Sequence, residues 1–79
     1  MTYIILDKAT RLYKIGKTQN IKKRLATLGT SNINLSLVLI TELDERFLHK
    51  LFKDKRIVKE WFGLTKEDIL SIIELEREK

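Results

Sequence analysis

The chain has 79 residues, 43% of them hydrophobic, which suffices for one small domain with a single core. It has no cysteine and one histidine, which excludes disulfides, thiolate zinc sites and histidine-rich metal cages. The formal net charge of +5 favours a polyanionic partner, most simply nucleic acid, although a solvated lysine-rich surface would give the same charge.

Two short apolar runs predict an antiparallel hairpin at the start of the chain. Tyr3–Leu6 and Leu12–Ile15 are rich in β-branched and aromatic residues, and polar residues separate them. Gly16 then allows a turn, or a close approach that a side chain would hinder. Lys17 lies in this expected turn.

An amphipathic helix is expected after the turn. Asn20 is a favoured N-cap, apolar residues recur from Ile21 to Leu28, and Gly29 is well placed just after the helix. Arg24 lies at the edge of the apolar stripe. Helix N-termini attract anions through their free N–H groups and dipole, so the nearby cations indicate an anion site.

A third strand and two further helices complete the expected fold. Thr30–Asn32 is a turn-forming cluster, and Ile33–Ile40 alternates before becoming fully apolar. We therefore predict an α/β (α+β) domain, with a small three-stranded antiparallel sheet flanked by about three helices. Residues 1–79 form one domain in this interpretation.

The second helix is expected to begin after Asp44, which can cap it. Its apolar stripe comprises Phe47, Leu48, Leu51 and Phe52. The following segment, Arg56–Leu64, could be a short strand or an irregular cover over the core. Thr65 and Asp68 predict a capping box at the start of a third helix.

The order and spacing of several fragments resemble the GIY-YIG nuclease superfamily. Gly16 is followed eight residues later by the helical Arg24, and Tyr3 matches the tyrosine of the first triplet. Glu45–His49 and Glu60–Phe62 are similar to a branch common in phage and mobile-element proteins. The resemblance extends from Tyr3 to about Leu64. It implies a domain that hydrolyses DNA phosphodiesters with one Mg²⁺ or Mn²⁺ ion.

The resemblance also implies roles for individual residues. Glu45, in a Glu-x-x-Leu pattern with Leu48, would hold the metal, although glutamate is favoured in any first helical turn. Arg24 would clamp the phosphate with its planar guanidinium, or it is an ordinary surface cation. Lys17 would contact the phosphate or the attacking water. The Tyr3 hydroxyl would orient or deprotonate that water, or Tyr3 is a core residue.

One position departs from the pattern. The second triplet of the superfamily reads Tyr-Ile-Gly, whereas here Lys14 precedes Ile15 and Gly16. Tyr13 is one place too early, and a one-residue offset points a strand side chain to the opposite face. Lys14 therefore faces the site. It would be the base only if Lys17 and Arg24 favoured its neutral amine, and otherwise it contacts phosphate. The late asparagine of the superfamily has no match here.

The remaining candidates support this site. His49 lies one helical turn after Glu45 and could be a second metal ligand, a proton carrier or a hydrogen-bond partner of Tyr3. Glu60 could orient a cation, while Trp61 and Phe62 close the core. The residues expected to bind DNA are Lys22, Lys23, Arg46, Lys50 and Lys53.

Two other functions remain open at this point: a non-catalytic DNA-binding module on the same fold, and a small basic domain that binds an acidic protein. Double-stranded DNA is the expected partner, with a homodimer or a partner protein as a source of specificity. The longest apolar run, Leu37–Ile40, is too short to cross a bilayer, and the N-terminus lacks signal-peptide features. We therefore expect no membrane partner and a cytoplasmic location, in a host cell if the protein is viral.

Overall fold

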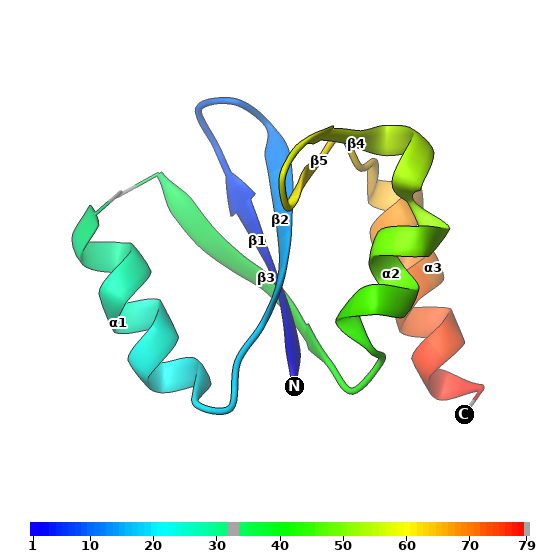
Figure 1. Cartoon of the computed structure of the whole chain (residues 1–79), viewed down its shortest axis with the longest axis horizontal. Coiled ribbons are helices and arrows are strands. Elements are labelled where there is room, and N and C mark those ends of the chain that lie inside the picture. The colour runs from blue at the N-terminus through cyan, green and yellow to red at the C-terminus, as the bar shows by residue number, and fades with distance from the viewer. Residues whose placement is uncertain (32–33, 79) are drawn as a thin grey trace.

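The computed structural model describes residues 1–31 and 34–78. Five strands form one antiparallel sheet in the order β3-β1-β2-β5-β4. Helix α1 lies on one side of the sheet and helices α2 and α3 lie together on the other (Figure 1). The elements in chain order are β1 (Thr2–Asp7), β2 (Leu12–Lys17), α1 (Ile21–Ser31), β3 (Leu35–Thr41), α2 (Glu45–Leu51), the 3-10 turn η1 (Lys53–Lys55), β4 (Arg56–Val58), β5 (Trp61–Phe62) and α3 (Lys66–Arg77).

The predicted N-terminal hairpin is confirmed, and both strands are longer than expected. β1 pairs with β2 from Thr2 opposite Lys17 to Asp7 opposite Leu12. Gly16 and Lys17 are therefore part of a strand, and the expectation of a glycine turn is wrong. The chain turns later, at residues 18–20, because β1 offers backbone partners as far as Thr2.

The prediction of a three-stranded sheet is also wrong. Residues 56–62 form a short hairpin whose β5 strand pairs with β2, Tyr13 opposite Phe62 and Lys14 opposite Trp61. Strands of two and three residues are too short to show a period of two in the sequence. Lys59 adopts a positive φ of 49° in the turn between them, which the sequence did not indicate because glycine usually fills such positions.

Helix α1 begins as predicted and ends later than predicted. The Asn20 side chain accepts a hydrogen bond from the backbone N–H of Lys23 at 3.1 Å, so the N-cap is confirmed. The helix continues to Ser31 and includes Gly29, which has no positive φ and does not end it. Glycine inside a helix costs only about 1 kcal/mol relative to alanine, so it is tolerated. Of the predicted turn and strand start, Asn32 and Ile33 lie outside the described residues.

Helices α2 and α3 differ in whether a side chain caps the N-terminus. Asp44 occupies the N-cap of α2, but its side chain makes no capping hydrogen bond. Leu48 and Phe52 are buried, whereas Phe47 and Leu51 are exposed, so only half of the predicted apolar stripe packs into the core. In α3 the predicted capping box is confirmed: the Thr65 side chain accepts from the Asp68 N–H, and the Asp68 carboxylate accepts from the Thr65 N–H.

The core lies between the sheet and the α2–α3 pair. Ile4 and Ile15 are neighbours across β1 and β2 and face this side. The buried cluster contains Ile4, Ile15, Leu43, Leu48, Phe52, Phe62, Leu64 and Ile72. Because strand side chains alternate, Tyr3, Lys14 and Gly16 point to the other face, toward α1. No helix in the described part of the chain is long and apolar enough to cross a membrane.

Candidate active site

Tyr3, Gly16 and Arg24 form one contact cluster. Tyr3 is fully buried, and it lies opposite Gly16 in the β1–β2 ladder. A Cβ atom on Gly16 would lie only 2.4 Å from Cζ and from the hydroxyl oxygen of Tyr3, so the tyrosine ring occupies the space that a side chain would need. The Nε–H of Arg24, from α1, donates to the Tyr3 hydroxyl at 3.1 Å.

This cluster determines how Arg24 is presented. The hydrogen bond uses Nε, so the two terminal amino groups of the guanidinium remain as a pair suited to two oxygens of an anion. The hydrogen bond to Tyr3 raises the pKa of Arg24, and the nearby negative charge of Glu60 adds to this. A small cavity of about 190 Å³ adjoins the side chain, lined by Thr18, Asn20, Lys23, Arg24 and Thr27.

Lys14 meets a carboxylate. Its Nζ lies 3.4 Å from a carboxylate oxygen of Glu60 and 5.8 Å from the centre of the Trp61 ring, which is opposite it on β5. The sequence indicated that Glu60 could orient a cation, and the cation that it contacts is Lys14.

His49 anchors α2 to the edge of β2. Its Nε2 lies 2.9 Å from the backbone carbonyl oxygen of Ile15 and 3.6 Å from a carboxylate oxygen of Glu45. A carbonyl oxygen can only accept, so Nε2 carries a proton and is not free to bind a metal. The ring also makes an edge contact with Phe62, with 5.0 Å between ring centres. In this arrangement the hydrogen bond from Nε2 goes to Ile15 and not to Tyr3, while the metal-ligand and proton-carrier roles of His49 stay predictions.

Glu45, the first residue of α2, lies where its negative charge is disfavoured. Burial raises its pKa, and the charge of Glu60 and a hydrogen bond with Glu60 raise it further, while His49 and Lys17 oppose the shift. Two carboxyl groups therefore share one partly buried position. A divalent cation there would relieve both the burial and the repulsion, so the donor set fits a hard metal ion.

Glu45 and Glu60 are the two candidate carboxylate ligands for a metal ion. Among the described residues, no group of three or more histidine, cysteine or acidic side chains is arranged to hold a metal. Mg²⁺ commonly uses one or two protein carboxylates and several waters, so Glu45 with Glu60 matches its usual demand.

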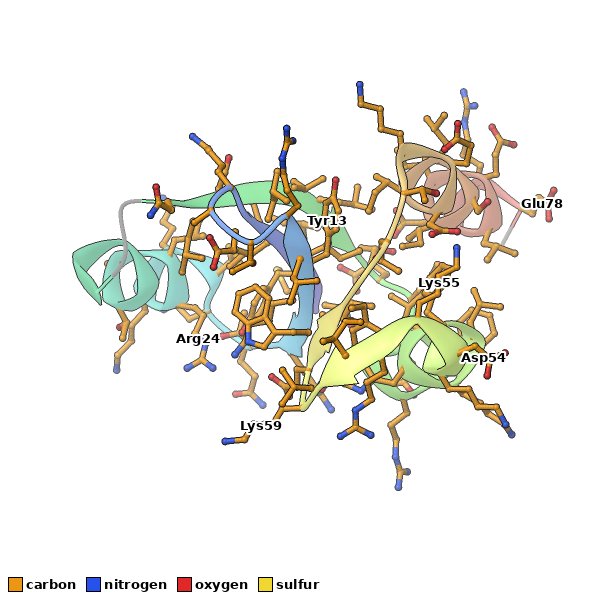
Figure 2. The ribbon with its side chains drawn as sticks, turned by 90° about the horizontal axis from the view of Figure 1, so that it is seen from above. Tyr13, Arg24, Asp54, Lys55, Lys59 and Glu78 are labelled. Carbon is orange, nitrogen blue, oxygen red and sulfur yellow. The ribbon has the colours of Figure 1, made fainter. Side chains whose placement is uncertain are left out.

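The other predicted residues lie outside this cluster. Tyr13 faces the core, opposite Phe62, as its one-residue offset predicts, and Figure 2 shows it apart from Arg24. Lys17, at the end of β2, is exposed and close enough to influence the pKa of Glu45. The residues expected to bind DNA are all exposed: Lys22, Lys23, Arg46, Lys50 and Lys53.

Two features of the site were missed from the sequence. Trp61 was expected to close the core, but it is only half-buried and lies beside Lys14. The backbone carbonyl of Ile15 contacts His49, and no sequence pattern predicts this contact because every residue has a backbone carbonyl. Both follow from the pairing of β5 with part of β2: the Ile15 N–H still donates to the Glu60 carbonyl, whereas the Ile15 carbonyl is left to His49 on α2.

These observations define a class of protein: a small α+β domain with a tyrosine–glycine–arginine cluster next to two coupled carboxyl groups. The model of the T5orf172 domain family matches residues 1–77. The chain therefore belongs to the T5orf172 domain family, which is related to GIY-YIG-like nuclease folds. No curated protein and no solved structure matches the chain.

Proposed function

We propose that this domain is a metal-dependent endonuclease that hydrolyses phosphodiester bonds of double-stranded DNA. One observation carries the proposal. Glu60 lies within electrostatic reach of Lys14, Arg24 and Glu45, so residues from β2, α1 and α2 converge around one carboxylate. Phosphodiester hydrolysis needs cations for the phosphate and a carboxylate for a metal, and this position offers both.

Each residue has a defined task in this proposal. Glu45 would hold one Mg²⁺ or Mn²⁺ ion, with Glu60 next to it, and the metal would supply Lewis-acid stabilisation of the departing oxygen. Arg24 binds the phosphate through its terminal amino groups, with Lys17 as a second cation. Tyr3 is fully buried and accepts from Arg24, so its task in this proposal is to position the guanidinium for the phosphate.

Lys14 has a separate task. When a phosphate oxygen replaces Glu60 as its partner, Lys14 contributes positive charge to the substrate and frees Glu60 for the metal. His49 is a positioning residue, because it holds α2, and therefore Glu45, against β2.

The test is nicking of a supercoiled plasmid in Mg²⁺, with EDTA as the metal-free control. Glu45→Gln should lose cleavage by at least about a hundredfold, the usual scale for removing one transition-state contact, with little change in DNA affinity. Glu42→Gln, an exposed carboxylate nearby, is the matched control and should cleave normally. Full cleavage by Glu45→Gln in Mg²⁺ would remove Glu45 from the mechanism.

The Lys14 contact favours one alternative function. A lysine paired with Glu60 stands where the nuclease triplet has a tyrosine, which is compatible with a DNA-binding module without catalysis. Salt-dependent gel shifts separate the outcomes: wild-type binding without nicking in Mg²⁺ or Mn²⁺ identifies the binding module. Absence of binding at low salt rejects both DNA functions.

A further inference from the structure

An apolar groove runs between α2, η1 and α3, on the side of the molecule away from α1. Its volume is about 690 Å³, and its apolar lining includes Leu51, Phe52, Leu70 and Leu75. Leu51 and Leu70 are 48% and 60% exposed, so large hydrophobic side chains remain in contact with water. Leu75 also lines a neighbouring cavity with Phe47, which is 45% exposed, and this lengthens the apolar surface.

The rim of this groove is acidic. Glu67, Glu74 and Glu78 line it and are exposed, Glu74 in an exposed ion pair with Arg77, whereas the less exposed Asp68 is held by Lys55 in an ion pair. Burial opposes the charged form of Asp68, but the lysine and the hydrogen bonds from Thr65 outweigh burial and lower the pKa of this carboxyl group. In a chain with a net charge of +5, an apolar floor with an acidic rim fits a segment that is apolar and basic.

The chain itself carries such a segment. Ile57 and Val58 in β4 are 63% and 52% exposed, and they lie between Arg56 and Lys59. β4 is also an edge strand, with β5 as its neighbour on one side. Exposed apolar edge strands favour association with a second chain.

We propose that β4 of a second copy of this chain occupies the α2–α3 groove. Ile57 of one copy covers Leu51 and Leu70 of the other, and Lys59, two residues later, approaches Glu74 on the acidic rim. Lys55 lines the groove and immediately precedes β4, and Figure 2 shows Lys55 between α2 and α3.

This adjacency permits a closed dimer. When groove and strand adjoin on one face, a two-fold axis near Lys55 lets each copy give its strand and receive the other's in the same complex. The pairing of Lys55 with Asp68 limits repulsion between the two lysines at the axis. The surface involves none of the residues proposed for catalysis, so the inference does not depend on the nuclease activity.

Sedimentation of the purified chain from micromolar to millimolar concentration tests the proposal. The wild type should dimerise, and added salt should weaken the dimer because charge pairs contribute to it. Glu74→Lys and Lys59→Glu should each weaken dimerisation by about tenfold or more. Ile57→Thr, which keeps a β-branched side chain, should weaken it through lost apolar contact. Lys8→Glu, the same charge change in the β1–β2 turn, should leave it unchanged.

The decisive measurement mixes the two charge variants, Glu74→Lys and Lys59→Glu. In a mixed dimer, the two substituted side chains face each other with opposite charges in one contact, and the unsubstituted Glu74 and Lys59 face each other in the other. The mixture should therefore regain the wild-type affinity. A wild-type chain that stays monomeric at millimolar concentration overturns the proposal. Dimers that neither charge variant weakens, or that mixing does not restore, overturn it as well.

Discussion

Gly16 is the residue on which the hairpin and the site both depend. Its missing side chain leaves room for the Tyr3 ring, and Tyr3 in turn positions Arg24. The requirement is steric, because no described glycine has a positive φ. The sequence showed that a glycine was needed there, but it could not show whether a turn or a close approach was the reason.

Gly16→Ala should therefore destabilise the protein. Tyr3 is fully buried and cannot swing away freely, so an extra methyl group should cost about 1–3 kcal/mol, as overpacking usually does. The matched control is Gly63→Ala, whose Cβ would have its nearest neighbours at 3.8 Å and should change stability by less than about 0.5 kcal/mol. Urea unfolding of both variants measures the difference, and equal stabilities would show that the Tyr3 contact is not restrictive.

Glu45 gives the residue-scale prediction for pH. Burial and Glu60 raise its pKa in the folded state above that of the unfolded chain, so the folded state binds this proton more tightly. The free energy of unfolding should therefore fall as pH rises through the raised pKa of Glu45, and Glu45→Gln should lack this component. Thermal unfolding from acid to neutral pH measures it, and subtracting the variant removes the opposite contribution of Asp68.

Magnesium provides a second measurement on the same residue. At neutral pH, Mg²⁺ should raise the unfolding temperature of the wild type, because a ligand bound to the folded state stabilises it. Glu45→Gln should not respond. An identical response of both proteins to Mg²⁺ would place the ion elsewhere.

At the scale of elements, local signals in the sequence were reliable where the neighbouring residues decide the structure. The N-terminal hairpin, the Asn20 cap and the Thr65–Asp68 box depend on residues close in sequence, and all three are confirmed. The same applies in part to the site, because the spacing of Gly16 and Arg24 reflects one strand–helix connection.

The elements that were wrong depend on distant partners. β5 exists because β2 offers it two residues to pair with, and a two-residue strand has no pattern of its own. The exposure of Phe47 and Leu51 likewise reflects where α3 lies, which the periodicity of α2 cannot reveal. The sequence indicated that Glu60 could orient a cation, but it could not show that this cation is Lys14, because the contact depends on the β5 pairing.

The two helix starts also allow a matched prediction. Thr65→Ala removes a cap that accepts a backbone N–H, and should cost about 1 kcal/mol of stability. Asp44→Ala removes a side chain that makes no such bond at the start of α2, so its cost should be clearly smaller. Chemical denaturation compares them, and an equal loss in both would mean that the cap geometry does not determine the effect.

For the whole molecule, the charge is unevenly distributed. Basic residues lie on α1 and along α2, at Arg46 and Lys50, whereas exposed carboxylates line the α2–α3 groove beside Lys55. The proposed DNA contact and the proposed dimer contact would therefore use different surfaces of the molecule. The net charge of the chain does not reveal this separation, because it averages the two surfaces.

Salt dependence of DNA binding measures this distribution. Each phosphate contact contributes about 0.9 to the slope of log affinity against log salt concentration, so Lys22→Ala with Lys23→Ala should lower the slope by up to about 1.8. Lys66→Ala, at the start of α3, should leave it unchanged. A uniform effect of all three lysines would indicate diffuse attraction and no preferred face.

The hydrogen bond from His49 to Ile15 has a further consequence for how the protein matures. The proposed phosphate-binding cations Lys14, Lys17 and Arg24 lie in the first part of the chain, whereas the coupled carboxyl groups of Glu45 and Glu60 arrive later. Ile4 and Ile15 in the first half face a core whose other buried residues all follow Thr41, so the first half depends on the second for its packing. The docking of α2 through His49 joins the two halves, so the proposed phosphate-binding residues and the proposed metal-binding residues reach their places in one folding step.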